Sequence, residues 1–328
     1  MPALINRFAL PIGAGIASAL LFVVTVKGTA IALALAYLAP LPIMIATLGW
    51  GLASGALAAA LASACVAVAV DPLSGLLFAL TVTLPSWLLA AFSVAPGFRL
   101  PWRRNDTPPD WMPVGAIVTF AAALAAVIGF GGLAALIVVY GGYEKALQAF
   151  AQSLVPAIEE AAGAGALAPD GGQSLDDFAL AIVRLSPAAI AGSTLLMSCV
   201  NLYAAARSTK LSHRLPRPWP DLPTALLLPV SVAALAIASL ALAFALPSPA
   251  DQFAWVVAGP LMAAFVLQGL AVLHALSRGL PLRPLLLAAL YFCCAIRSTW
   301  TLPAIAFIGL VESFATLRAR AAAGRSKV

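Results

Sequence analysis

The sequence is poor in charge. Only 9% of its 328 residues are Asp, Glu, Lys or Arg, whereas 63% are hydrophobic. A soluble domain carries about 25% charged residues, so this apolar excess cannot be packed into one soluble core. The alternation of apolar and polar residues that marks a membrane β-barrel is also absent. We therefore expect an integral membrane protein whose apolar runs of about 20 residues cross the bilayer as helices.

Residues that could bind a metal or catalyse a reaction are scarce. The four cysteines all lie in apolar runs and have no metal-type spacing to histidine, so we interpret them as small core residues: Cys65, Cys199, Cys293 and Cys294. The sequence also lacks HExxH, a paired acidic motif and a Ser-His-Asp set. An intramembrane protease or a magnesium-dependent prenyl transferase needs such groups to activate water or bind diphosphate. We expect neither an enzyme nor a cofactor or metal site, and the net charge of +6 does not indicate a nucleic-acid partner.

Acidic residues are missing from the predicted helix midpoints. A proton-driven carrier generally needs buried carboxylates that load and release protons, so a self-powered proton antiporter is not favoured. Sodium coupling through backbone carbonyls stays open.

The apolar runs that are present predict an all-α, polytopic transmembrane helix bundle. We expect helices at roughly 8–26, 30–48, 51–70, 73–95, 113–140, 183–206, 223–246 and 254–276. The last apolar region, 285–317, is too long for one ordinary span and is interrupted at Arg297, with Pro303 just beyond. Two short passes or a re-entrant hairpin fit this region better than one helix. The expected total is eight to ten spans, several of them broken by proline.

The basic residues predict the topology. If the predicted helices alternate across the membrane, 14 of the 18 Lys and Arg residues fall on one side. The opposite side receives the other four: Lys27, Lys145, Arg184 and Arg297. By the positive-inside rule, the richer side is cytoplasmic and both termini lie there.

The longest loop, 141–182, is then expected outside. Helical spacing of four apolar residues predicts an amphipathic helix in it: Leu147, Phe150, Leu154 and Ile158. Gly171 and Gly172 then break the chain, and Ser174 can cap a second short helix. The loop is either a surface helical hairpin that covers the bundle or a lid over a cavity.

A proline-rich connector, Ser208–Leu222, divides the chain. Pro216, Pro218 and Pro220 make it stiff and extended. We take it as the boundary between a six-helix membrane bundle, 1–207, and a second region, 208–328, of further membrane helices and a basic tail.

Two prolines stand within the second predicted helix, in LAPLPIMIATLGWG (38–51). Proline in a helix interior costs roughly 3 kcal/mol, so this helix is expected to break between Ala39 and Ile43. Broken backbone at membrane depth is tolerated where it is buried in protein or lines a cavity. The alternative is that neighbouring hydroxyls simply repair the helix. Residues beside this break and beside Pro85 form the candidate ligand pocket: Tyr37, Pro40, Pro42, Thr47, Thr83, Pro85, Ser86, Trp87 and Asn201.

Small residues recur at a spacing of four in the first helix. Gly13 with Ala17, and Gly15 with Ala19, form a flat strip that favours close helix approach. The strip either packs within the chain or forms a partner face of Gly13, Ala17 and Ala19.

Four segments carry a family resemblance. They are LAPLPIMIATLGWG, LPSW (84–87), NLYAAARSTKLSHRLPRPWPDL (201–222) and GLVESFATLRAR (309–320). Together they resemble the YybS-like family of bacterial membrane proteins of unknown function. That family often has an aspartate in the last motif and a second acid four residues later, where this chain has Glu312 and Thr316.

The YybS-like family is thought to be remotely similar to the S components of energy-coupling-factor vitamin transporters. These are six-helix bundles that bind a small molecule from outside and dock to a membrane coupling subunit through an alanine-rich face on the first helix. The resemblance implies that Gly13, Ala17 and Ala19 could form such a face. This chain departs from S components in having further passes after Thr209.

The leading hypothesis is a bacterial inner-membrane protein that binds an unknown small molecule between proline-broken helices, with transport as an open extension. The competing hypothesis is a non-transport scaffold or cell-envelope assembly factor that recruits another membrane protein. The lipid bilayer is the expected surrounding in both cases.

Overall fold

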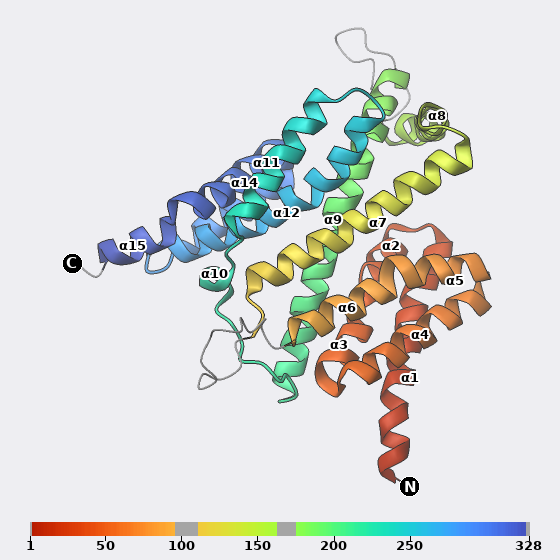
Figure 1. The fold of residues 1–328 in the computed structure, drawn as a ribbon, viewed down its shortest axis with the longest axis horizontal. Helices are drawn as coiled ribbons and strands as arrows, with labels where there is room; N and C mark the ends of the chain where they lie inside the picture. Colours follow the sequence, from red (N-terminus) through yellow and green to blue (C-terminus); the bar gives the residue numbers. More distant parts are fainter. Residues whose placement is uncertain (1, 96–110, 163–174, 326–328) are drawn as a thin grey trace.

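The structure is a computed structural model, and it describes residues 2–95, 111–162 and 175–325. Its architecture is all-helical (Figure 1). The first part contains two long helices, α1 (Pro2–Val23) and α4 (Leu52–Ala69), and four shorter ones: α2 (Ala30–Ala36), α3 (Pro40–Trp50), α5 (Pro72–Phe78) and α6 (Leu84–Ser93). A 3₁₀ turn, Val24–Lys27, follows α1, and a π turn, Ala79–Thr83, joins α5 to α6.

Longer helices dominate the second part. These are α7 (Val114–Tyr140), α8 (Tyr143–Ala162), α9 (Leu175–Leu211), α10 (Leu222–Ala225), α11 (Val230–Ala245), α12 (Ala250–Leu276), α13 (Arg283–Ile296), α14 (Ser298–Ala315) and α15 (Leu317–Arg325). Helix α9 crosses the whole molecule and packs against α3, α7, α8 and α12.

The predicted membrane fold is confirmed. Within the described ranges, eight helical stretches are long and apolar enough to cross a membrane, and two are broken ones, Ala30–Trp50 and Pro72–Ser93. Helices α11 and α13 are apolar but shorter, with 16 and 14 residues. The 285–317 region forms two helices, α13 and α14, that meet at Arg297.

Some helix starts were predicted wrongly. The expected helix 183–206 begins at Leu175, so residues 175–182, where a second short helix was expected in the loop, are the first part of α9. The expected helix 223–246 begins only at Val230, after the single turn of α10 and an extended segment, Leu226–Pro229. Pro229 lacks the N–H that a continuous helix would need there, and its fixed φ suits the residue before a helix. Pro260, by contrast, lies inside a continuous α12.

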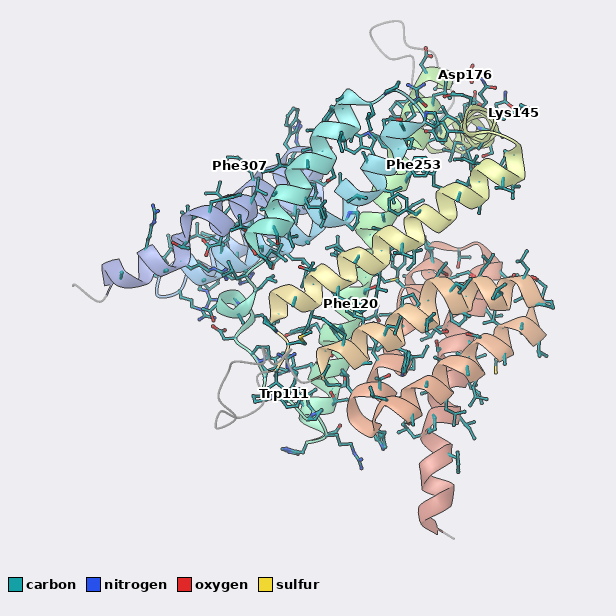
Figure 2. The ribbon with its side chains drawn as sticks, in the orientation of Figure 1. Trp111, Phe120, Lys145, Asp176, Phe253 and Phe307 are labelled. Atoms are coloured by element: carbon teal, nitrogen blue, oxygen red, sulfur yellow. The ribbon has the colours of Figure 1, made fainter. Side chains whose placement is uncertain are left out.

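Side-chain contacts distinguish two ends of the bundle. At the connector end, the Arg214 guanidinium lies 4.5 Å from the centre of the Trp50 ring, at the end of α3. At the α8 end, Ser248 donates a 3.0 Å hydrogen bond to Glu144. Figure 2 shows Lys145 and Asp176 together at the α8 end and Trp111 at the connector end.

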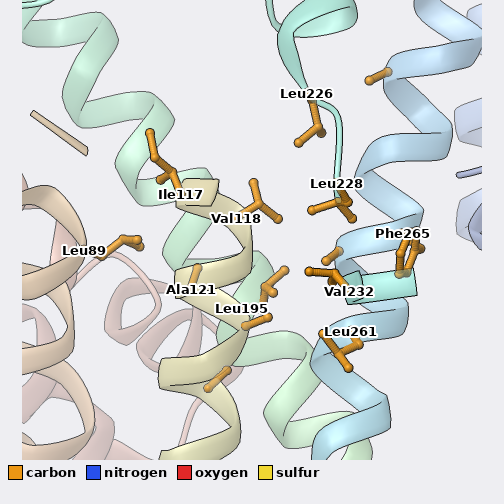
Figure 3. Packing of buried hydrophobic residues seen from close by; sticks show 14 of the residues in the cluster. Leu89, Ile117, Val118, Ala121, Leu195, Leu226, Leu228, Val232, Leu261 and Phe265 are labelled. Carbon is orange, nitrogen blue, oxygen red and sulfur yellow. The ribbon is translucent and has the colours of Figure 1, made fainter. Parts of the chain in front are cut away.

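The main core lies between α7, α9 and α12, where Val118, Leu195 and Phe265 are buried (Figure 3). Glycine lets α12 and α14 approach closely. A Cβ at Gly309 would lie 2.1 Å from the carbonyl oxygen of Phe265, so the larger side chains that fill lipid-facing positions cannot stand there.

Helix α8 occupies the first half of the predicted loop 141–182, with Leu147 buried against the bundle and Phe150 more exposed. Gly171, Gly172 and Ser174 lie outside the described residues. Helix α9 runs through position 207 to Leu211, and the division into 1–207 and 208–328 stays a prediction.

Candidate ligand site at the connector end

The extended segment Leu226–Pro229 interrupts the helical backbone inside the bundle. Leu226 and Leu228 are buried, and Leu228 is only 1% exposed. Figure 3 shows both side chains facing Ile117 and Val118 of α7. Because lipid offers no hydrogen bonds, the free N–H and C=O groups of such a segment need partners from the protein.

Gln268 of α12 supplies the first of these partners. Its Oε1 accepts a hydrogen bond from the Leu228 N–H, and its Nε2 donates to the Gly309 carbonyl at 2.6 Å and to Ser313 Oγ at 2.9 Å. Ser313 Oγ in turn donates to the Leu228 carbonyl at 3.2 Å. One fully buried amide therefore ties α12 and α14 to the extended segment.

Arg318 closes the other side of the segment. Its Nη1 donates to the Pro223 carbonyl at 2.6 Å and its Nη2 to the Leu226 carbonyl at 2.8 Å. Its Nε forms a 2.7 Å ion pair with Glu312, and both side chains are largely buried, with exposures of 11% and 4%. A buried pair with this many hydrogen bonds fixes geometry, since neither charge can be removed without leaving the other unpaired.

Gly115 lets the first turn of α7 touch the same segment. A Cβ at this position would lie 1.8 Å from the Leu227 carbonyl oxygen. Only glycine permits this approach, which positions the start of α7 beside the break.

A cavity of about 560 Å³ adjoins this junction, between α7, α9, α12, α13 and the connector. Its lining is mostly apolar: Ile117, Val118, Leu202, Ala206, Leu226 and Leu267. A smaller group of polar and aromatic side chains also reaches it: Ser93, Tyr203, Arg217, Trp219, His274 and Tyr291. His274 Nε2 and Tyr291 Oη share a 2.8 Å hydrogen bond.

Arg217 brings a positive charge into the cavity wall. Its Nη1 donates to the Ser93 carbonyl at 2.7 Å and its Nη2 to the Met112 carbonyl at 3.3 Å, which joins the connector to α6 and to the start of α7. Its Nε is buried with no hydrogen-bond partner. Burial lowers the pKa of Arg217 below its ordinary value, but a guanidinium in a protein stays protonated.

Asp221 neutralises another arginine of the connector end. Arg278 donates to both of its carboxylate oxygens, at 2.8 and 2.6 Å. This hydrogen bonding lowers the pKa of Asp221 to about 2. Both side chains are well exposed to solvent, so the pair is screened and contributes little to stability.

The predicted ligand residues lie elsewhere, around the break between α2 and α3 and around the π turn that leads into α6. The break falls at Tyr37–Ala39 and not between Ala39 and Ile43, because Pro40 and Pro42 fit the first turn of α3, where no donor is needed. The Ala36 and Leu38 carbonyls accept hydrogen bonds from the N–H groups three residues later, those of Ala39 and Leu41, both at 3.0 Å.

Side chains from two other helices complete this break. Asn201 Nδ2 of α9 donates to the Tyr37 carbonyl at 2.7 Å, and Ser18 Oγ of α1 donates to the Ala39 carbonyl at 2.7 Å. Of the predicted set, the structure thus brings Tyr37, Pro40 and Asn201 together.

The remaining predicted residues also bond to nearby groups. Thr47 donates to the Ile43 carbonyl, and Ser86 donates to the Val82 carbonyl beside Pro85. Thr83 shares a 2.9 Å hydrogen bond with Ser63, and the Trp87 indole donates to the Leu52 carbonyl at 2.9 Å. None of the predicted residues lines the connector-end cavity. A ligand site at these residues stays a prediction.

The predicted partner face is divided by the structure. Ala19 is buried with Ala59 and Ala62 of α4, whereas Gly13 is exposed with nothing within 4 Å of a built Cβ. Half-buried Ala17 lies between these two environments. Whether Gly13, Ala17 and Ala19 dock a partner stays a prediction.

Sequence reasoning missed Arg217 and Arg318 as site residues. Arg217 stands in the proline-tryptophan connector and Arg318 in the GLVESFATLRAR segment, which are the more specific parts of the family resemblance. Their place in these segments was a signal that could have identified them, but both arginines were interpreted only as markers of membrane topology.

A comparison with protein families assigns the chain to one of them. Residues 16–313 match the family described as "Predicted membrane protein (DUF2232)". The chain belongs to this family. No curated protein and no solved structure matches the chain. This DUF2232 member is thus a multi-pass membrane protein, and the family description names no ligand or partner.

Proposed function

We propose that this DUF2232 member binds a small, largely apolar molecule in the connector-end cavity. The supporting observation is the cavity itself, because ligand pockets have volumes of about 300–1,000 Å³, apolar walls and a few convergent polar groups. The 560 Å³ cavity matches this description, with Arg217, His274 and Tyr291 among its polar groups.

The proposal keeps the S-component-like character that the YybS-like resemblance implies, including binding without catalysis. It differs in the side of the membrane from which the ligand is expected to enter. Several basic residues lie at the connector end, among them Arg207, Lys210, Arg214 and Arg217. By the positive-inside rule, they favour a cytoplasmic position for this end and for both termini, in a bacterial inner membrane. A ligand would then enter from the cytoplasmic half of the bilayer, whereas S components bind from outside.

Reporter fusions test this orientation. A cytoplasmic reporter should be active at Val328, and a periplasmic reporter should be active near Gly171. A periplasmic signal at Val328 would contradict the topology.

The natural Cys199 offers a direct test of binding, because it lines the cavity. In a Cys65→Ala, Cys293→Ala, Cys294→Ala variant it is the single thiol. Native mass spectrometry would show whether a sample carries a bound molecule. An apolar thiol reagent should label Cys199 slowly in gently extracted protein that carries one, and faster in protein that has lost it. Ala206→Phe should fill the cavity and remove the bound mass, while the control Ala204→Phe, outside the lining, should not. Protein that never carries such a mass would contradict the proposal.

Scaffolding is the second candidate, and one surface of α1 favours it. Four large apolar side chains are exposed there beside the open Gly13: Phe8, Ile12, Ile16 and Leu20. A membrane protein that co-purifies with the wild type but not with Gly13→Leu would support this function.

A further inference from the structure

One face of α9 changes from apolar to basic along its length. Val200, Tyr203, Arg207 and Lys210 are spaced i, i+3, i+7 and i+10, and all four are exposed. Such spacing places them on one side of the helix. At a rise of 1.5 Å per residue, Val200 and Lys210 are about 15 Å apart along the axis. This face therefore extends from the apolar depth of the bilayer to its boundary.

The apolar part of this face belongs to the mouth of the cavity. Val200 and Tyr203 of α9 and Tyr291 of α13 all line the cavity, yet they are 60%, 49% and 48% exposed. The cavity is therefore open to the side of the bundle between α9 and α13. At the depth of Val200, the surroundings of α9 are lipid chains, so an apolar chain can enter sideways.

The basic part of the face gathers around Trp219, which also lines the cavity. The Trp219 ring lies edge-on to Tyr203, with ring centres 5.5 Å apart. Lys210 Nζ lies 5.0 Å and the Arg207 guanidinium carbon 5.8 Å from the centre of the Trp219 ring. Tryptophan and tyrosine favour the membrane interface, where their amphipathic rings meet the lipid headgroups.

These cations differ from two other arginines at this end, Arg278 and Arg318. Arg278 is paired with Asp221 and Arg318 with Glu312. Within the described part of the chain, no carboxylate pairs with Arg207, Lys210 or Arg217, and Arg217 donates only to carbonyls. Among the described residues, the cavity mouth thus presents positive charge without a paired carboxylate, beside an apolar opening.

We infer that the cavity binds an anionic, phosphate-bearing lipid. The lipid chain lies in the apolar opening between α9 and α13, and the phosphate meets Arg207 and Lys210, with Arg217 behind them in the wall. This inference rests on the proposed function and names the chemical class of its ligand. Basic pockets between helices on the cytoplasmic side are suited to phosphate headgroups, since Lys and Arg near a membrane surface attract anionic lipid.

Lipid binding to the purified full chain tests the inference. Native mass spectrometry would compare phosphatidylglycerol, phosphatidylcholine and inorganic phosphate. We expect phosphatidylglycerol to bind at least tenfold more tightly than phosphatidylcholine and to slow the labelling of Cys199. Arg207→Gln with Lys210→Gln should remove this preference at an unchanged Tm. The exposed control Arg320→Gln should retain it.

Three results would overturn the inference. Equal binding of the two lipids would show that only annular lipid is present, and tight binding of inorganic phosphate without chain dependence would show a free-anion site. A non-lipid molecule that protects Cys199 would also exclude the lipid, but it would leave the proposed function intact. Protein that never carries a bound mass, and in which Cys199 is never protected, would instead contradict the proposed function itself.

Discussion

Two non-helical breaks in the described part of the bundle, Tyr37–Ala39 and Leu226–Pro229, have their backbone groups satisfied in different ways. At Tyr37–Ala39, the local backbone tightens and two side chains, Asn201 and Ser18, donate to the remaining carbonyls. At Leu226–Pro229, the backbone is extended and depends on Gln268, Ser313 and Arg318, which come from three other helices.

The difference lies in how much backbone each break exposes. A three-residue turn can reuse its own carbonyls through short-range bonds, so two short polar side chains are enough. An extended segment cannot bond to itself, so it needs long side chains that reach across helices. The second break therefore holds four elements together and adjoins a cavity, and the first forms a closed helix joint.

The strongest test of this comparison is Arg318→Gln. It leaves the buried Glu312 unpaired and frees the Pro223 and Leu226 carbonyls, so we expect a loss of about 3 kcal/mol in unfolding free energy. The measurement is denaturant unfolding in detergent. Arg320→Gln is the matched control. Glu312→Gln combined with Arg318→Gln should recover part of the loss, and a double variant less stable than Arg318→Gln would contradict the buried-pair interpretation.

A smaller effect is expected at the first break. Asn201→Ala removes the donor to the Tyr37 carbonyl, and hydrogen bonds between membrane helices contribute about 1 kcal/mol. The same unfolding assay should therefore show roughly a third of the Arg318→Gln effect. Ser193→Ala, whose hydroxyl bonds only to its own helix, is the control. A loss equal to that of Arg318→Gln would remove the distinction between the breaks.

Replacing the prolines of the first break should have less effect again. Pro40→Ala with Pro42→Ala is expected to change stability by less than about 0.5 kcal/mol, because the first turn of α3 needs no donors at these positions. Thermal unfolding in detergent measures this. A large gain in stability would contradict this expectation, because it would mean that the prolines strain the backbone and force the helix to break.

The smallest effect belongs to the exposed pair at the connector end. The pKa of Asp221 is lowered to about 2 from 3.8, so its contribution is complete above pH 3.8 and is lost as the pH falls through 2. The difference in Tm between wild type and Asp221→Asn should therefore be small and constant from pH 5 to 8. It should shrink in high salt, since exposed pairs are screened. A difference that changes within this pH range would show that another group titrates there.

The helical fold could be predicted because long apolar runs without charge have one stable arrangement in a bilayer. The broken helices at Pro40 and Pro85 were also predictable, since each proline in the sequence marks a missing backbone N–H donor. Their partners were not, because nothing local to Tyr37 indicates that Asn201 will lie beside it.

The connector-end site escaped prediction for the same reason. Its apolar wall is made of residues common in any membrane helix, such as Ile117 and Ala206. Only three-dimensional packing gives Arg217 and Gln268 their roles, because the groups that they satisfy are backbone atoms of distant segments. The start of α11 at Val230 had one signal in the sequence, Pro229, but the residues before it are as apolar as those after it and favoured a helix from 223.

The hydrogen bond from Asn201 to Tyr37 has a consequence for biosynthesis. Its two residues are 164 positions apart. At a synthesis rate of about 5–20 residues per second, the Tyr37 carbonyl is inserted into the membrane about 10 to 30 seconds before its partner is made. During that time water, lipid headgroups or an insertion factor must cover it. A nascent chain arrested before Asn201 should therefore be open at this joint and crosslink there to its surroundings, and the crosslink should vanish once α9 has been inserted.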